Sequence, residues 1–279
     1  MNDASDDIVW RGMTRAQLDA AYNNTEAVRD SAQRRDAWTA RSARFRAENP
    51  RLLDLPYGTR PRNRIDIFPC GRSLAPLYVF IHGGYWQRNS KEIFSCMAEG
   101  PLAHGFDVAL IGYTLAPDAT LTEIVSEVRT ALRWLRAKGA EHGVAKGKII
   151  VSGWSAGGHL TAMTLAEADA AMPISGIFDI EPCRLNYLND ALKMTLEEQV
   201  NLSPIRQLPS RGIPIAVAFG TAELPELQRQ SRDYVSALRG ANIPAEIFPI
   251  EGQNHFSILE ELASPTGSLV DRLIRLASS

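Results

Sequence analysis

The sequence predicts an α/β fold with a mostly parallel central sheet and helices on both faces. Short apolar runs alternate with longer stretches of helical periodicity from residue 63 to the end. Strands that alternate with helices need crossover connections, which make neighbouring strands parallel. The 279 residues are 45% apolar and 22% charged, a composition typical of a chain that buries its own core. We expect a single domain over residues 1–279.

A helical segment is predicted over residues 14–48, before the sheet begins. Thr14 and Gln17 form a capping-box pattern for a helix start. The residues that follow are rich in Ala, Arg, Gln and Glu, and we expect two helices with a break near Tyr22-Asn23-Asn24. The arginines of this segment stand among Ala, Asp and Glu at helical spacings, which is typical of a solvated helix face.

The strands and helices of the sheet region then follow in a regular order. Residues 64–68 alternate in polarity as a half-exposed strand does, and residues 76–82 form the apolar run of a buried parallel strand. Further strands are expected at 106–113, 148–153, 171–179, 213–219 and 245–250. Helices are expected at 121–138, 156–168, 224–239 and 269–277. Residues 180–212 show no strand pattern, and we expect a small cap insertion over the ligand crevice at the carboxyl edge of the sheet.

Charge and cysteine usage argue against several classes of protein. The 30 Lys and Arg nearly balance 32 Asp and Glu, so the net charge of −2 gives no electrostatic footprint for nucleic acid. No apolar stretch approaches the roughly 20 residues that span a bilayer. The opening from Met1 to Asp7 is acidic, without a signal-peptide run. Cys70, Cys96 and Cys183 are too widely spaced to indicate a disulfide framework or a zinc site. We expect a cytoplasmic protein without membrane, nucleic-acid or metal partners.

The sharpest functional signal is Gly153-Trp154-Ser155-Ala156-Gly157, a G-x-S-x-G pattern between an apolar strand and an apolar helix. A serine exposed at a strained strand-to-helix turn needs small neighbours, and its oxygen then lies at a helix N-terminus. The pattern therefore predicts Ser155 as a nucleophile. A glycine-rich turn that only packs is the alternative, but it leaves the other motifs without a purpose.

A glycine-rich loop directly after the strand residues 77–81 is predicted to stabilise an oxyanion. Its sequence is His82-Gly83-Gly84-Tyr85-Trp86. Acyl transfer needs backbone N–H donors that stay in place, and two glycines let the backbone approach a ligand closely. We expect the amides of Gly83 and Gly84 to act with that of Ala156. A phosphate-binding turn is the alternative, but the chain has neither G-x-G-x-x-G nor a Walker lysine here.

Ser155 also needs a base to take its proton and a carboxylate to orient that base. His255 follows the last strand in Asn254-His255-Phe256, the loop position where such sheets carry the base. The chain order of serine, acid and histidine places the acid between them. Glu223 fits best, because it follows the strand at 213–219. Asp179 and Glu226 are the competing carboxylates.

These motifs resemble the kynurenine formamidase (arylformamidase) branch of the α/β-hydrolase superfamily. The resemblance covers most of the chain, including the helical entry at 18–24. It is carried by His82-Gly83-Gly84-Tyr85-Trp86, Ser155-Ala156-Gly157-Gly158-His159, Gly220 through Glu226 with Gln230-Ser231, and Asn254-His255-Phe256.

The resemblance implies the α/β-hydrolase fold and a catalytic triad of Ser155, the residue at 223 and His255. It also implies an oxyanion hole at the amides of 83, 84 and 156. Two positions depart from the family pattern. The family usually has Asp where this chain has Glu223, and Phe where it has Leu227.

The expected activity is acyl transfer to water through an acyl-enzyme, without metal or cofactor. Tyr85, Trp86 and Phe256 are expected to contact a planar ring, while Trp154 and Phe178 fit the core equally well. The expected substrate is a small-acyl aryl amide or ester, with N-formylkynurenine-like formamides as the first choice. A broad short-chain carboxylesterase is the alternative, and a ligand-binding homologue without turnover is a third hypothesis.

Overall fold

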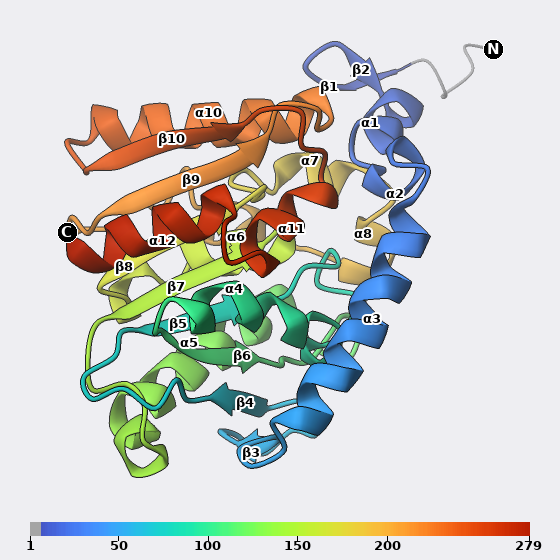
Figure 1. The fold of residues 1–279 in the computed structure, drawn as a ribbon. Helices are drawn as coiled ribbons and strands as arrows, with labels where there is room; N and C mark the ends of the chain where they lie inside the picture. Colours follow the sequence, from blue (N-terminus) through green and yellow to red (C-terminus); the bar gives the residue numbers. More distant parts are fainter. Residues whose placement is uncertain (1–6) are drawn as a thin grey trace.

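A computed structural model describes residues 7–279, with an eight-stranded sheet at the centre (Figure 1). The strand order is β10-β9-β8-β7-β5-β6-β4-β3. The bounds are β3 Leu55–Pro56, β4 Arg64–Phe68, β5 Leu77–Ile81, β6 Asp107–Ile111, β7 Ile149–Trp154, β8 Ala170–Ile174, β9 Ile215–Gly220 and β10 Ala245–Ile250. Strands β5 to β10 pair in parallel, whereas β4 runs antiparallel to both β6 and β3. The predicted mostly parallel sheet is confirmed.

Two apolar cores lie on opposite faces of the sheet, because successive side chains of a strand point to opposite sides. In β5, Leu77, Val79 and Ile81 belong to one core, and Tyr78 and Phe80 to the other. The first core includes residues of α5 (Leu121–Lys138), α6 (Ala156–Ala162) and α10 (Pro225–Gly240). The second includes residues of α3 (Ser31–Glu48) and α12 (Ser268–Ser278). Helices therefore cover both faces, as predicted.

The N-terminal segment forms three helices rather than the expected two, and a short hairpin precedes them. The hairpin is β1 Ile8–Trp10 with β2 Met13–Thr14, and the helices are α1 Arg15–Ala21, α2 Asn24–Ala27 and α3. The capping box of Thr14 and Gln17 is confirmed, and the chain breaks after Tyr22 as expected. Figure 1 shows these helices along the side of the sheet where the parallel strands end. Residues 1–6 of the acidic opening lie outside the described residues.

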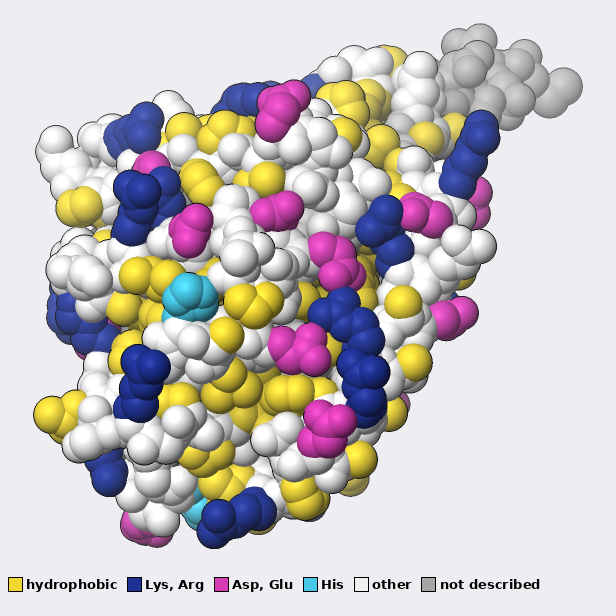
Figure 2. Space-filling model, in the orientation of Figure 1, with side chains coloured by type: hydrophobic (Ala, Val, Ile, Leu, Met, Phe, Trp, Pro, Cys, Tyr) yellow, Lys and Arg dark blue, Asp and Glu magenta, His cyan; other side chains and the backbone are white. Residues whose placement is uncertain are grey.

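Ion pairs join α3 to neighbouring helices. Arg41 pairs with Glu99 at 2.9 Å and with Glu260 at 2.8 Å. Figure 2 shows basic and acidic side chains side by side along this edge of the molecule. The expected solvated face holds only in part, because Arg35 and Arg44 are exposed, whereas Arg41 and Arg46 are partly buried in ion pairs that hold α3 to the rest of the protein.

Two predicted elements are shorter than expected. The strand expected at 171–179 ends at Ile174, because Ser175 adopts a φ of 50° and the N–H groups of Phe178 and Asp179 donate to the Gln230 side chain. The helix expected at 156–168 ends at Ala162. Just beyond that end, the Thr164 hydroxyl bonds back to the carbonyls of Leu160 and Thr161, a local contact that competes with regular helix.

The segment 180–212 contains short helices and no strand, as the sequence predicts. These helices are α7 Glu181–Leu185, α8 Asn189–Leu192 and α9 Leu196–Asn201. The remaining elements are η1 Lys91–Ala98, α4 Glu99–Ala103, η2 Gly139–His142, η3 Leu165–Glu167, η4 Ser257–Leu259 and α11 Glu260–Ala263. Within residues 7–279, none of the helices combines the length and the apolar character that crossing a bilayer requires.

Gly157 lies where α6 passes close to the end of β5. A Cβ at this position would lie 2.0 Å from the carbonyl oxygen of Ile81. We predict that Gly157→Ala lowers the free energy of unfolding by about 1–3 kcal/mol, because two backbone segments must move apart. Chemical denaturation of the purified variants measures the loss. Gly240→Ala is the matched control, since nothing lies within 4 Å of its Cβ position. Equal losses in both variants would contradict the prediction.

Candidate active site

Ser155 lies at the sharp turn between β7 and α6. Its φ of 59° and ψ of −117° fall in a region that residues other than glycine rarely adopt. Neighbouring backbone holds the turn, because the Ser155 N–H donates to the carbonyl of Ile174 in β8 at 2.9 Å. Its own carbonyl accepts the N–H of His159 at 3.1 Å. The structure therefore shows the strained strand-to-helix turn that the G-x-S-x-G pattern predicts.

His255 and Glu223 form a buried pair beside this turn. The imidazole Nδ1 lies 3.2 Å from Glu223 Oε2, and the side chains are 3% and 0% exposed. The other carboxylate oxygen accepts the Ser175 hydroxyl at 2.5 Å and the Gly220 N–H at 2.7 Å. A carboxylate at Nδ1 selects the tautomer whose Nε2 is able to accept a proton.

The competing carboxylates have other partners. Asp179 lies 3.6 Å from Arg206, and Glu226 pairs with Arg229 at 2.8 Å. Of the three candidate acids, Glu223 alone contacts His255.

Ser155 and His255 line the same cavity, whose volume is about 510 Å³ including space open to solvent. No hydrogen bond joins Ser155 to His255 within the described chain. Catalytic hydrogen bonds are often loose in enzymes without substrate and tighten when it binds. The Trp154 indole N–H donates to the His255 carbonyl at 2.7 Å, which fixes the loop that carries the imidazole.

The cavity wall combines aromatic rings with cationic groups. Its aromatic residues are Trp38, Tyr85, Phe94, Trp154 and Phe256. The exposed side chains of Arg35 and Arg88 also line it, and neither takes part in an ion pair within residues 7–279. No carboxylate belongs to the described wall, so the cavity suits a flat and negatively charged molecule.

The glycine-rich loop lies directly against the serine. A Cβ on Gly83 would come 2.6 Å from the Trp154 carbonyl and 3.0 Å from the Ser155 Cβ, so a larger residue does not fit. Gly84 has a φ of 120° and lines the cavity. The N–H groups of both glycines donate to no acceptor in the described part of the protein. Ala156 is the first residue of α6, a position whose N–H has no partner inside the helix.

The three residues expected to contact substrate lie in different places. Tyr85 and Phe256 line the cavity, but Trp86 is fully buried in the core and does not. The Trp86 indole N–H donates to His159 Nδ1 at 3.2 Å, and the two rings meet edge to face. The backbone of the loop reverses at Tyr85 and Trp86, which have φ values of 51° and 58°. With this backbone conformation, the Tyr85 side chain lines the cavity and the Trp86 side chain packs in the core.

The N-terminal segment supplies wall residues that the sequence analysis missed. Trp38 of α3 stacks on Phe256 with ring centroids 6.3 Å apart. Asn24 donates to the Tyr85 hydroxyl at 2.8 Å, and its Oδ1 has no partner in the described chain. An unusual Trp within an Arg-rich helix was the available signal, but only tertiary packing places this helix at the site.

Comparisons with known proteins agree with this geometry. The family model BD-FAE matches residues 66–223. The chain is 30% identical to the kynurenine formamidase of Danio rerio, covering 96% of this chain and 98% of that protein. It is 33% identical to the kynurenine formamidase of Salmo salar over 81% of each chain. The chain belongs to the kynurenine formamidase family. It is thus a hydrolase of the α/β-hydrolase fold.

Solved structures support the same fold. A protein from Silicibacter sp. TM1040, named as a candidate thioesterase, superposes with a TM-score of 0.83 at 30% identity. The match covers 94% of this chain and 99% of that one. Among residues 7–279 of this family member, no group of three or more His, Cys, Asp or Glu side chains is arranged to hold a metal ion.

The buried imidazole of His159 makes the free energy of unfolding depend on pH. Burial lowers its pKa to about 4, although its contact with the Leu202 carbonyl opposes the shift. In the unfolded chain the pKa is about 6.5. The native state is therefore fully stabilised above about pH 6.5 and loses stability as the pH falls towards 4, because only the unfolded chain takes up the proton. The loss reaches about 1.4 kcal/mol per pH unit.

We predict that His159→Gln makes the decline of urea midpoints from pH 6.5 to 4.5 shallower than in the wild type. His82, whose pKa burial also lowers to about 4, retains part of the slope. His104→Gln, at an exposed position, serves as the control. An unchanged slope in His159→Gln would show that this imidazole does not contribute.

Proposed function

We propose that the chain hydrolyses N-formylkynurenine-like aryl formamides, with Ser155, His255 and Glu223 as the catalytic triad. One observation carries the proposal. Ser155 lies at a strained turn in the same cavity as His255, and Glu223 contacts Nδ1 of that imidazole, which leaves Nε2 to act as the base. The kynurenine formamidases among the relatives support the substrate class.

The reaction follows from this arrangement. Ser155 Oγ attacks the formyl carbon while His255 Nε2 takes the hydroxyl proton. The N–H groups of Gly83, Gly84 and Ala156 stabilise the negative oxygen of the tetrahedral intermediate. Its collapse breaks the C–N bond, and the arylamine leaves with the proton from His255. A water molecule activated by His255 then hydrolyses the formyl ester of Ser155 and releases formate.

The cavity wall supports a substrate that carries both a ring and a negative charge. Phe94, Phe256 and Trp38 provide flat apolar surfaces beside the serine. N-formylkynurenine is a zwitterion, and we propose that its carboxylate, rather than its ammonium group, faces the favourable potential of Arg35 and Arg88.

Other sequence predictions extend this proposal. We propose a single domain of residues 1–279, with residues 180–212 as a small cap insertion. Among the described residues, however, Asn24, Arg35 and Trp38 of the 14–48 segment line the cavity of Ser155 and His255, and no residue of 180–212 does. The enzymes among the relatives support a small molecule as the partner. A cytoplasmic location remains a prediction from the sequence.

A second candidate function is short-chain ester hydrolysis. The chain is 26% identical to the esterase LipC of Mycobacterium tuberculosis over 67% of its length, and it spans about half of that protein. The same triad would cleave an ester, since only the leaving atom changes from nitrogen to oxygen.

A substrate panel decides between these activities. We predict that kcat/KM for N-formylkynurenine exceeds that for formanilide, which lacks the carboxylate, and that for p-nitrophenyl acetate by about tenfold or more. Steady-state kinetics on the purified protein measure the ratios. Better turnover of the ester would assign a carboxylesterase. In Ser155→Ala, labelling by a fluorophosphonate probe should disappear and only residual hydrolysis should remain. A wild type that does not label would indicate a binding protein.

The acid has its own test. We predict that Glu223→Gln lowers kcat by about 10³–10⁴-fold, because the amide no longer stabilises the imidazolium or selects the tautomer. Glu223→Asp should retain more activity, since it keeps the charge but lies one methylene further from His255. Glu226→Gln is the matched control and should keep kcat within about threefold of wild type. A larger loss in the control than in Glu223→Gln would reassign the acid.

A further inference from the structure

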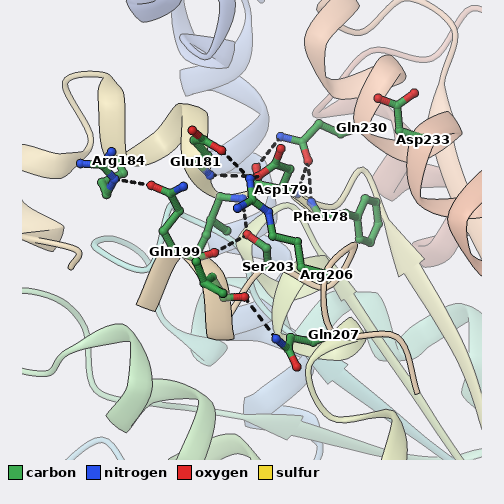
Figure 3. A network of polar contacts seen from close by, with 12 residues as sticks. Phe178, Asp179, Glu181, Arg184, Gln199, Ser203, Arg206, Gln207, Gln230 and Asp233 are labelled. Carbon is green, nitrogen blue, oxygen red and sulfur yellow. Dashed lines mark hydrogen bonds and ion pairs between the residues drawn. The ribbon is translucent and has the colours of Figure 1, made fainter. Parts of the chain in front are cut away.

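The side-chain amide of Gln230, in the middle of α10, makes all the hydrogen bonds that it can, yet Gln230 has no part in the proposed reaction. It is 1% exposed. Its Oε1 accepts the N–H groups of Phe178 at 2.6 Å and Asp179 at 2.7 Å. Its Nε2 donates to the Asp179 carbonyl at 2.9 Å and to the Tyr22 hydroxyl at 2.8 Å. Figure 3 shows the amide facing the loop of Phe178 and Asp179. Two donors and two acceptor lone pairs are all satisfied.

One side of this amide fixes the loop that supports Glu223. The loop begins at Ser175, whose hydroxyl donates to Glu223 Oε1 at 2.5 Å. The Ser175 N–H donates to the Ala218 carbonyl of β9 at 2.7 Å, which anchors the first end of the loop. The bonds from Phe178 and Asp179 to Gln230 anchor its second end. The position of the Ser175 hydroxyl is therefore set from both ends.

The other side of the amide leads to the oxyanion loop. Gln230 donates to the hydroxyl of Tyr22, which is fully buried between α1 and α2. The Tyr22 carbonyl accepts a hydrogen bond from the Tyr85 hydroxyl. Tyr85 directly follows Gly84, whose N–H is one of the proposed oxyanion donors. The chain of contacts from Gln230 thus ends one residue from that donor.

The segment 180–212 attaches to the same loop. Arg206 forms ion pairs with Asp179 at 3.6 Å and with Glu181 (Figure 3). The Ser203 hydroxyl accepts the N–H of Ile180 at 3.2 Å. Gln230 therefore lies where α10, the N-terminal segment and the loop that carries the 180–212 segment meet.

We infer that Gln230 is a positioning residue that holds the support of Glu223 and the oxyanion loop in register with each other. The inference rests on the proposed triad and oxyanion donors. A neutral amide is required because the side chain must accept two N–H groups and donate to two oxygens at the same time. A carboxylate would place an acceptor against the Asp179 carbonyl, and an aliphatic side chain would leave two buried N–H groups unpaired.

The test compares Gln230→Leu with wild type in the full chain. Turnover of p-nitrophenyl acetate and the rate of fluorophosphonate labelling are the readouts, because both report on the serine machinery whatever the natural substrate is. We expect kcat to fall by about 10–100-fold through misplaced catalytic groups. KM should stay within about threefold, since no substrate contact is removed.

Ser231→Ala is the matched control for stability. Ser231 is the buried neighbour of Gln230, and among residues 7–279 its hydroxyl bonds only to the Leu227 carbonyl of its own helix, at 3.2 Å. This variant should keep kcat within about twofold even where its Tm falls. A Gln230→Leu enzyme that loses Tm but keeps the wild-type kcat would overturn the inference.

Tyr22→Phe tests the branch to the oxyanion loop, because it removes the hydroxyl that Gln230 contacts and keeps the buried ring. The same hydroxyl donates to Glu226 Oε2 at 3.3 Å, so Glu226→Gln, which leaves the Gln230 contact in place, is its control. Tyr22→Phe should lower kcat by about 3–10-fold, and the double variant with Gln230→Leu should lose less than the product of the single losses. A double variant whose loss of kcat equals the product of the two single losses would overturn the inference. An unchanged kcat in Tyr22→Phe would do so as well, and this test remains available if Gln230→Leu does not fold. Labelling that persists in Ser155→Ala would instead refute the proposed function.

Discussion

The site depends on the close contact between β7, β5 and the first turn of α6. A Cβ on Gly153 would lie 2.4 Å from the Gly157 carbonyl, and one on Gly157 would meet the Ile81 carbonyl. Because the backbones of β5, β7 and α6 pack this closely, the chain has little freedom between strand and helix. The unusual dihedral angles of Ser155 persist because these neighbouring elements fix them. The same contact places the start of the glycine-rich loop beside the serine, so nucleophile and oxyanion donors share one support.

The acid of the site shows how the fold accommodates a longer side chain. The family usually has Asp where this chain has Glu223, whose extra methylene carries its carboxylate further from the backbone. Both oxygens of Glu223 are held, one by His255 and the other by Ser175 and the Gly220 N–H. The charge is buried, and such a charge is tolerated only when hydrogen bonds satisfy it. The loop after β8 therefore stabilises the Glu223 carboxylate through the hydroxyl of Ser175.

Local patterns were sufficient to predict the sheet apart from its edge strand β3, and the strained turn at Ser155. The bounds of β4, α5 and β10 match the predicted ranges. The expected half-exposure of β4 is wrong, because its polar residue Asp66 is fully buried in ion pairs with Arg46 and Lys91. The end of β8 was not predictable, because Gln230, more than 50 positions later in the chain, takes the N–H groups of Phe178 and Asp179. Trp86 was misplaced for a related reason, since its direction depends on backbone reversal and on His159.

The docking of the N-terminal helices has a consequence for synthesis on the ribosome. Tyr22 bonds to Gln230 and Trp38 bonds to Glu260 at 2.6 Å, so residues translated early meet partners translated near the end. Helix α3 also packs on residues translated much earlier, since Ser42 donates to the Ile93 carbonyl and Phe45 contacts Phe68. Only the contacts with Gln230 and Glu260 wait for the last part of translation, and contacts of such large sequence separation form slowly. The aromatic wall includes Phe256, so it is completed only near the end of translation. The residues of the serine turn are translated earlier, before the binding site is complete.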